Sequence, residues 1–279
     1  MDKFIKNAYA KINWSLLITG RRDDGYHELD MLMQEIDLHD VLSLEKASKN
    51  ELFVNGMPSD DADNLVVKAI TALSRECGRD LPVRVRLTKV IPSRAGLGGG
   101  SADCAQTLHM MNELFELNIS MDRMNVIAAA LGADVPFFLH GGLCRVRGIG
   151  EKVEPVTGAP SFPIVIKHVG DGLSTPEVYR KCDEIGFETP GANTEKTLRS
   201  ILDRDLPEVN KNSANALEKA AFALDERIPA AIEKLYEQGA LYARMSGSGS
   251  AVYGVFENET SARRAAEAIP GSIMSFTRA

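Results

Sequence analysis

Partial alternation of apolar and polar positions predicts β-strands near the start of the chain. Residues 7–18 alternate in this way, and the two-residue spacing places Lys11 and Asn13 on one face of the strand. A second strand is expected over residues 29–38, after a turn-rich loop at residues 22–27 that carries two ring side chains. The fold is therefore expected to open with two strands joined by a loop.

Shorter strands are expected before the first third of the chain ends. Residues 41–45 and 51–54 are expected to form a short β pair. In residues 83–88, valines and a leucine alternate with arginines and a threonine, which predicts a strand with one solvent-facing side. That strand leads the chain into a glycine-rich stretch at residues 92–103.

Apolar residues at helical spacing predict helices between these strands and after them. One helix is expected over residues 64–76, with Asp63 as its N-cap and Gly78 as its stop. A second helix follows the glycine-rich stretch. A third helix is expected to begin after Ser120, which is a good capping residue, and to end at Gly132.

Short strands and helices continue through the second half of the chain. The expected strands are 143–147, 164–167 and 251–256, and the expected helices are one that begins near residue 175, then 217–224, 230–238 and 260–268. No internal repeat or long low-complexity linker interrupts them.

Length and charge narrow the classes of function. At 279 residues, the chain is longer than one ordinary domain, so two domains that share a cleft are expected. Hydrophobic residues make up 44% and charged residues 25%, as in soluble globular proteins. The net charge of −7 argues against a general nucleic-acid or membrane-surface role. Any site for a phosphate must therefore be built locally.

The remaining composition favours a cytoplasmic protein without a zinc site or a disulfide framework. Residues 1–20 contain lysines and no apolar run of signal-peptide length, and no later stretch approaches a membrane span. The cysteines are far apart and form no C-x-x-C pair, so buried thiols are expected. These cysteines are Cys77, Cys104, Cys144 and Cys182.

The glycine-rich stretch at residues 92–103 is interpreted as a phosphate cradle. Backbone N–H groups can converge on an anion where glycine has no Cβ, and the N-terminus of the following helix adds its positive dipole end. Gly100 is followed by Ser101 without a lysine, which excludes a P-loop, and the same serine breaks the dinucleotide fingerprint. Protein-kinase tripeptides are also missing. An ordinary glycine-rich turn remains the alternative.

Two further segments are candidates for chemistry. Asp134 places a carboxylate inside the apolar run 133–138, where it needs a cation, hydrogen-bond donors or a catalytic role. A helix cap or turn residue is the alternative for this aspartate. The serine–glycine run at residues 246–250 lies between two expected strands, and such runs are usually only turns.

Taken together, these motifs resemble the GHMP small-molecule kinases. The segments that carry the resemblance follow the family's order over nearly the whole chain: Ala10–Asn13, Gly25–His27, Pro92–Asp103, Leu131–Pro136, Ser174–Pro176 and Met245–Gly249. The resemblance implies an α+β fold of two domains, with a nucleotide-binding domain at residues 1–152 and a C-terminal domain at residues 153–279. It also implies an active site in the cleft between the two domains.

The resemblance assigns the kinase chemistry to particular residues. Lys11 matches the family's catalytic lysine and Asp134 its catalytic aspartate, so the carboxylate would accept a hydroxyl proton while the ammonium stabilises developing charge. ATP is the implied phosphoryl donor, and Mg²⁺ is implied with it. Ser101 is a possible metal neighbour, but no carboxylate ligand is identified. The residues implied to bind ATP are Pro92, Gly96, Leu97, Gly98, Gly99, Gly100 and Ser101.

Within the family, the match is to kinases that phosphorylate the tertiary C2 hydroxyl of a cytidine diphosphate alcohol in isoprenoid precursor synthesis. Tyr26 and Tyr179 would sandwich the base while His27 hydrogen-bonds its edge. Other positions implied to contact substrate are Asn13, Thr175, Gly247 and Gly249. The partner is thus a small molecule, with no nucleic acid and no membrane, and the protein is a monomer or a homodimer.

Several positions depart from the family pattern and leave room for an altered substrate. They are Cys104, Arg145, Arg147, His168 and Ser250. One alternative is a GHMP kinase for another alcohol, such as homoserine or mevalonate. Another is a non-catalytic nucleotide-binding or RNA-binding protein on this fold.

Overall fold

The computed structural model describes residues 3–59 and 61–279, and the chain divides into two compact units. Unit 1 contains the described residues up to Ala10 together with Leu38–Ile91 and Gly98–His140. Unit 2 contains Lys11–Asp37, Pro92–Leu97 and Gly141–Ala279. Each unit is therefore assembled from segments that are distant in sequence.

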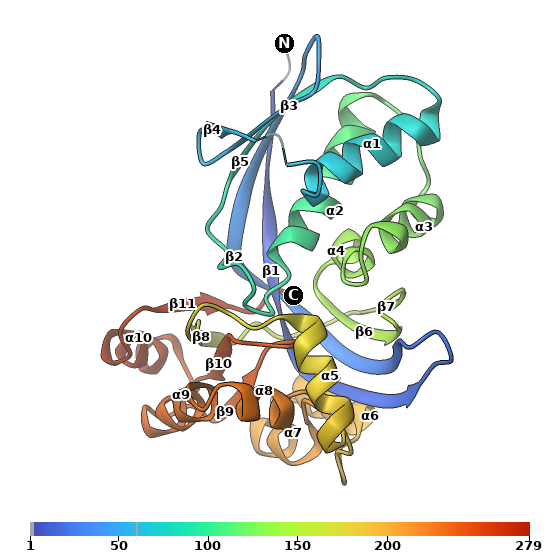
Figure 1. Cartoon of the computed structure of the whole chain (residues 1–279). Helices are drawn as coiled ribbons and strands as arrows, with labels where there is room; N and C mark the ends of the chain where they lie inside the picture. The colour runs from blue at the N-terminus through green and yellow to red at the C-terminus, as the bar shows by residue number, and fades with distance from the viewer. Residues whose placement is uncertain (1–2, 60) are drawn as a thin grey trace. The chain divides into compact units, whose positions relative to one another are not determined.

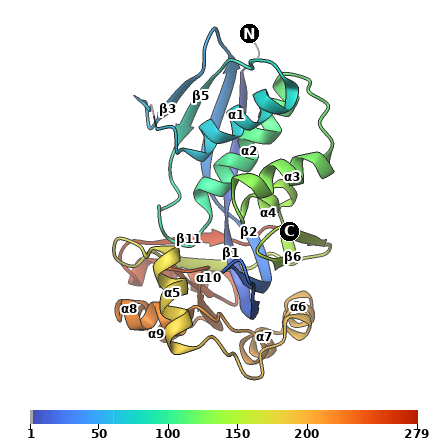
Figure 2. The same cartoon turned by 45° about the vertical axis from the view of Figure 1, so that its right-hand side comes forward.

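Two long strands contribute residues to both units. They are β1 (Phe4–Arg21) and β2 (His27–Lys46). The other elements of unit 1 are β3 (Glu51–Val54), β4 (Met57–Pro58), α1 (Leu65–Cys77), β5 (Val83–Thr88), α2 (Gly99–Leu114), α3 (Met121–Leu131) and α4 (Val135–His140). In this unit, α1 and α2 pack against each other on one side of β3 and β5 (Figures 1 and 2).

The elements of unit 2 are more numerous, and its four-stranded antiparallel sheet has the order β11-β8-β10-β9. They are β6 (Leu143–Gly148), β7 (Lys152–Val156), β8 (Pro163–Lys167), α5 (Thr175–Ile185), α6 (Thr194–Leu202), α7 (Leu206–Asn212), α8 (Glu218–Leu224), α9 (Arg227–Glu237), β9 (Tyr242–Met245), β10 (Val252–Val255), α10 (Glu259–Ala268) and β11 (Ser272–Phe276). Helices α9 and α10 pack on this sheet (Figure 1).

Residues 29–45 form one strand rather than the two that were predicted. The whole segment belongs to β2, and burial alternates without a break from Leu38 to Leu44. Asp40 occupies one of the buried positions in this alternation. In the sequence alone, a charged residue at such a position suggests that the strand is interrupted. The fold accommodates the buried carboxylate because the backbone N–H groups of Val90 and Ile91 donate to it.

The predicted pairing of residues 41–45 with residues 51–54 is wrong. Strand β5 lies between them: Leu44 of β2 pairs with Val85 in antiparallel register, and Leu52 of β3 pairs with the same Val85 in parallel register. Proximity in sequence suggested a hairpin, but β2 and β3 lie on opposite sides of β5. Strand β5, which separates them, follows β3 by about thirty residues in the sequence.

Most helix ends follow the predicted capping chemistry, with one correction. The side chain of Ser120 caps α3, and Gly78 ends α1 in the left-handed conformation. The cap of α1, however, is Asn64 and not Asp63: the Asn64 side chain accepts a hydrogen bond from Val66 N at 2.9 Å. Asp63 forms an ion pair with Lys68 instead.

A cluster of aromatic side chains lies in the core of unit 2. The Trp14 ring lies 5.4 Å from the Tyr242 ring and 6.2 Å from the Tyr253 ring, centroid to centroid, and all three residues are fully buried. Trp14 follows Asn13 on β1, so these rings anchor the part of β1 that carries Lys11 and Asn13.

The expected buried thiols are confirmed for three of the four cysteines. Cys104, Cys144 and Cys182 are buried, whereas Cys77, the last residue of α1, is half-buried. Among the described residues, no helix has the length and apolar character needed to cross a membrane.

Candidate active site

Lys11 and Asn13 form a buried polar pair on β1, within unit 2. Lys11 Nζ donates to Asn13 Oδ1 at 2.6 Å, and the two residues are 3% and 1% exposed. Side chains two apart in a strand share a face, so the prediction that they lie together is confirmed. The backbone N–H of Lys11 also donates to the Leu97 carbonyl at 3.0 Å, which connects the lysine to the start of the glycine-rich stretch.

The two small-residue loops meet in unit 2 beside Lys11. Ser246 Oγ donates to the Gly96 carbonyl at 2.9 Å, and Ala251 N donates to the Ala95 carbonyl at 3.0 Å. A Cβ on Gly96 would overlap the Ser246 carbonyl oxygen, and a Cβ on Gly247 would lie 3.0 Å from Lys11 Nζ. Only glycine lets the backbones approach this closely.

The remainder of the glycine-rich stretch begins α2 and belongs to unit 1. Gly98 is the N-cap, with φ of 74°, and the helix starts at Gly99. The first N–H groups of a helix have no partner within the helix, so those of Gly99, Gly100 and Ser101 form a donor cluster at the positive dipole end. The position of Ser101 in the first turn was correctly predicted.

A buried charge cluster lies under this helix start, and sequence reasoning missed it. Lys89 Nζ pairs with Asp40 and lies 2.7 Å from Asp103 Oδ2. Burial raises the pKa of Asp103 to about 7, and the neighbouring Asp40 carboxylate contributes to this rise. The two carboxylates share the single ammonium of Lys89. A Cβ on Gly99 would lie 3.3 Å from Lys89 Nζ. The Lys89 ammonium therefore lies close to the backbone at the start of α2.

Asp134 lies in unit 1, in the turn that immediately precedes α4. The carboxylate was expected to sit inside the apolar run, but it is half-buried, whereas Val135–Leu139 are buried. The apolar residues of α4 pack inward and leave Asp134 at the start of the helix. Both the helix-start geometry and a chemical role are compatible with this position.

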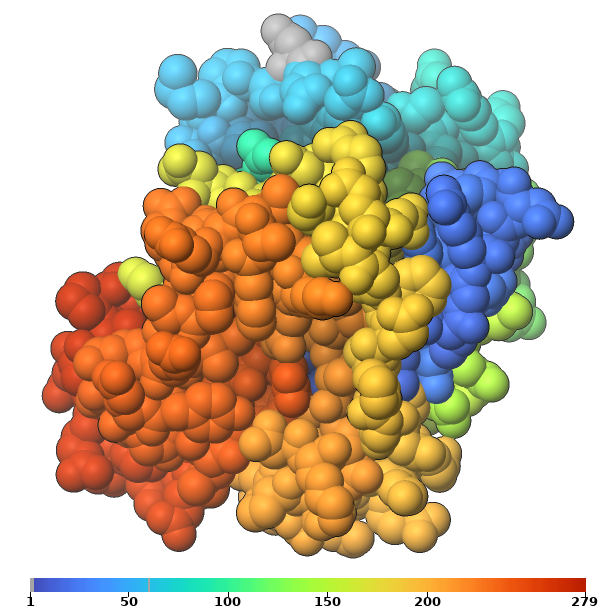
Figure 3. All heavy atoms as spheres, turned by 60° about the horizontal axis from the view of Figure 1, so that its bottom comes forward, coloured from blue at the N-terminus to red at the C-terminus, as the bar shows by residue number. Residues whose placement is uncertain are grey.

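Two of the three residues predicted to hold a base, His27 and Tyr179, come together in unit 2. His27 Nε2 lies 2.7 Å from Asp183 Oδ1, and the Tyr179 ring lies 5.0 Å from the His27 ring. In Figure 3 the yellow helix α5 lies alongside the blue residues at the turn between β1 and β2. Tyr26 is 60% exposed and sits on the loop before β2.

Asp183 and Phe187 are members of this cluster that sequence reasoning missed. The Phe187 ring packs edge-on against His27, at 6.0 Å and 84°. Asp183 lies one helical turn after Tyr179, so helical periodicity places it on the same face as a residue that was predicted. Thr175 begins α5, and its hydroxyl lies 2.7 Å from Ser248 Oγ, which connects this helix to the second loop.

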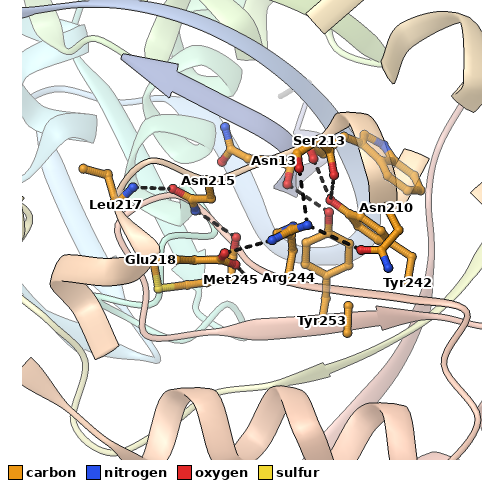
Figure 4. Close-up of polar contacts among 12 residues, drawn as sticks. Asn13, Asn210, Ser213, Asn215, Leu217, Glu218, Tyr242, Arg244, Met245 and Tyr253 are labelled. Carbon is orange, nitrogen blue, oxygen red and sulfur yellow. Dashed lines mark hydrogen bonds and ion pairs between the residues drawn. The ribbon is translucent and has the colours of Figure 1, made fainter. Parts of the chain in front are cut away.

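A largely buried polar network connects residues around the second loop, as Figure 4 shows. Arg244 Nη1 pairs with Glu218 Oε2 at 3.0 Å, and Glu218 Oε1 accepts from Met245 N at 3.0 Å. Asn215 Nδ2 donates to the carbonyls of Met245 and Gly247, at 3.0 and 2.8 Å. Because these partners are backbone groups at the loop entrance, the network fixes the path of the loop.

The same network reaches β1 through two tyrosine hydroxyls. Tyr242 donates to the Trp14 carbonyl at 2.6 Å, and Tyr253 donates to the Asn13 carbonyl at 2.9 Å. The backbone of the Lys11–Asn13 pair and the serine–glycine loop are thus held by one set of hydrogen bonds.

Three of the five positions that depart from the family pattern, Arg145, Arg147 and Ser250, have polar partners in the structure. Arg145 binds both Asp30 oxygens at 2.9 Å, and Arg147 pairs with Glu154. Ser250 Oγ donates to the Val169 carbonyl. Buried His168 Nε2 has no hydrogen-bond partner among the residues described. The two arginines are neutralised by neighbouring acids, so they add no uncompensated positive charge.

Comparison with known proteins identifies the family. The model of the GHMP kinases N-terminal domain matches residues 64–142, and that of the GHMP kinases C-terminal domain matches residues 197–272. These regions lie on either side of the predicted domain boundary at residues 152 and 153, which itself stays a prediction. The chain is 40% identical to 4-diphosphocytidyl-2-C-methyl-D-erythritol kinase of Thermoanaerobacter sp. (strain X514), over 92% of this chain and 89% of the relative.

Solved structures agree with this relationship. A crystal structure of 4-(cytidine 5'-diphospho)-2C-methyl-D-erythritol kinase is similar with a TM-score of 0.84 and 33% identity, covering 99% of this chain and 100% of that one. Homoserine kinase from Cytophaga hutchinsonii shares the fold, with a TM-score of 0.71 and 18% identity over 100% of this chain and 95% of that one. The predicted mixed α and β kinase fold is confirmed, and the chain belongs to the GHMP kinase family.

Proposed function

We propose that this protein transfers the γ-phosphoryl group of ATP to the C2 hydroxyl of 4-diphosphocytidyl-2-C-methyl-D-erythritol. The observation that carries the choice of substrate is the ring cluster of His27, Tyr179 and Phe187. An aromatic base stacks on rings and hydrogen-bonds at its edge, whereas homoserine and mevalonate offer no such group. The names of the relatives that match over most of the chain support the same substrate.

In the proposed reaction, Asp134 accepts the proton of the attacking hydroxyl and Lys11 stabilises the negative charge that develops. A carboxylate is a suitable acceptor for that proton, and the buried ammonium acts where charge interactions are strong. Asn13 holds the ammonium through its side-chain oxygen at 2.6 Å, which restricts where Lys11 can point. Positioning and charge neutralisation are the main means by which phosphoryl transfer is catalysed.

The donor nucleotide is assigned to the glycine-rich stretch. The N–H groups at the start of α2 would bind ATP phosphates, and the Gly96–Ser246 contact would fix the loop that precedes them. Mg²⁺, when it is bound with ATP, supplies neutralisation of the phosphate charge. No cluster of three or more metal-ligating His, Cys, Asp or Glu residues occurs in the part of the chain that is described. Mg²⁺ would then be held mainly by phosphates and water, and the Ser101 hydroxyl is the group of this chain that we propose would contribute to holding it.

We also propose that this reaction takes place in the cytoplasm. The test of substrate is a coupled ADP-release assay with 4-diphosphocytidyl-2-C-methyl-D-erythritol, homoserine and mevalonate as competing acceptors. We expect a clear preference for the cytidylated alcohol. Equal or greater activity with either of the other two alcohols would refute this assignment.

The test of mechanism is Asp134→Asn, with Asp122→Asn as a matched control on exposed surface of the same unit. We expect Asp134→Asn to bind ATP normally while turnover falls about 10²- to 10⁴-fold, because the variant has no proton acceptor. Asp122→Asn should keep its activity. ATP affinity is measured by calorimetry and turnover by the coupled assay. Near-normal turnover of Asp134→Asn would overturn the proposed role of this carboxylate.

A further inference from the structure

The His27 imidazole is held at one nitrogen by a carboxylate from a distant part of the chain. Its side chain is 7% exposed, and Nε2 lies 2.7 Å from Asp183 Oδ1 on α5. The second carboxylate oxygen of Asp183 lies 3.5 Å from Arg21 Nη2. Asp183 is therefore held from two sides, by the end of β1 and by the start of β2.

This contact determines which imidazole nitrogen carries the hydrogen. A carboxylate oxygen accepts hydrogen bonds, so the short contact requires a hydrogen on Nε2 of His27. In the neutral ring, Nδ1 then has a lone pair and acts as an acceptor. Nδ1 forms no hydrogen bond with any residue in the described ranges 3–59 and 61–279. One acceptor on a largely buried ring is thus left for a ligand.

Two neighbouring rings limit rotation of the imidazole. Tyr179 lies against one face, with 32° between the ring planes, and Phe187 packs edge-on. Tyr179 and Asp183 are four residues apart on α5, so one helical face supplies both the stacking ring and the carboxylate. Rotation that exchanged the two nitrogens would break the Asp183 contact and disturb this packing.

We propose that Asp183 is a positioning residue that fixes the tautomer of His27 and thereby makes the site select cytosine over uracil. Cytosine carries an amino group at position 4, which donates to an Nδ1 acceptor. Uracil carries a carbonyl oxygen at that position, and two facing acceptors leave both groups unpaired. This inference rests on the proposed function, because it names the group that reads the base of the proposed substrate.

The tautomer is measured directly by ¹⁵N NMR of the imidazole in the full-length protein. We expect the His27 signals of the wild type to report hydrogen on Nε2 and a bare Nδ1. In Asp183→Asn the amide can either accept from Nε2 or donate to it, so both tautomers should be populated. Glu184→Gln removes the same charge from the next residue of α5, which pairs with Lys181 at the surface, and should leave the His27 signals unchanged.

The consequence for recognition is measured with the cytidine compound and its uridine counterpart. The wild type should favour the cytidine compound by about 100-fold or more in kcat/KM. Asp183→Asn should lower this preference about tenfold, through a higher KM for the cytidine compound, because the variant no longer enforces the acceptor. Saturating kcat should stay within about twofold, since Asp183 is assigned to the base and not to the reacting hydroxyl. Glu184→Gln should keep the wild-type preference.

The outcomes separate this inference from the function on which it rests. A wild type that phosphorylates neither compound would refute the proposed function, and the base-reading role with it. Activity on the cytidine compound with an unchanged preference in Asp183→Asn would overturn the inference alone. If Asp183→Asn does not fold, the wild-type NMR spectrum still decides, because hydrogen on Nδ1 contradicts the proposed tautomer.

Discussion

Replacement of Gly96 by alanine tests whether the contact between the two loops holds the site together. Gly96 has φ of +73°, and a Cβ there would overlap the Ser246 carbonyl oxygen and lie 3.0 Å from Gly249 N. Gly158 has φ of +78° with nothing within 4 Å of an added Cβ. Gly158→Ala is therefore a matched control that carries the conformational cost without the collision.

The two variants should differ by the cost of separating the loops. Alanine in the left-handed region costs about 1–2 kcal/mol, which both variants bear. Forcing an extra carbon into a packed contact adds about 1–3 kcal/mol for Gly96→Ala alone. At about 2–4 °C per kcal/mol, Tm should fall by about 10 °C for Gly96→Ala and by about 4 °C for Gly158→Ala.

Activity should separate the variants further. The collision displaces the backbone that binds Ser246 and adjoins Leu97, whose carbonyl accepts from Lys11 N. Displacements of about 1 Å in catalytic groups cost about 100-fold in rate, so kcat/KM of Gly96→Ala should fall by that order while Gly158→Ala stays near wild type. Scanning calorimetry and the ADP-release assay give both quantities. Equal losses of Tm together with retained activity would refute the reasoning about the loop contact.

Three further changes probe the buried polar groups. Glu218→Ala should cost about 3–5 kcal/mol in the free energy of unfolding, because the largely buried Arg244 guanidinium loses its ion-pair partner. Urea denaturation measures this cost, and a cost no larger than that of a surface ion pair would contradict the expectation. Asn215→Ala should cost about 1–3 kcal/mol in the same assay and lower turnover, because the Gly247 carbonyl loses its donor; unchanged stability and rate would exclude this role. Burial raises the pKa of Asp103 from 3.8 to about 7, so between these pH values the folded chain binds a proton that the unfolded chain lacks. The stability that this group contributes is therefore fully present below about pH 4 and is lost as the pH rises through about 7. Relative to Asp103→Asn, the wild type should therefore gain stability as pH falls from about 8 to about 5, and a constant difference in denaturation midpoints over that range would contradict it.

Local features of this chain were predictable because their causes lie within a few residues. Alternation located β5 and the Lys11–Asn13 face of β1, and the cap of α3 followed from Ser120. Apolar residues at helical spacing after the glycine-rich stretch likewise predicted that α2 begins there.

Errors arose where a distant segment changed the meaning of a residue. Asp40 reads as a break in a strand until Val90 and Ile91, fifty residues later, donate to its carboxylate. The supposed pairing of residues 41–45 with 51–54 failed because β5 enters between them. In both cases, the distant segment leaves no sequence pattern near the residues whose surroundings it changes.

The sequence by itself determined the family, the two glycine-containing loops and the chemistry-bearing side chains, because those depend on residue types at short spacings. The tertiary structure decided which groups hold them. Asp183 meets His27 across 156 residues, and Ser246 meets Gly96 across 150. Buried polar groups must find partners, and only folding determines which distant donor or acceptor supplies them.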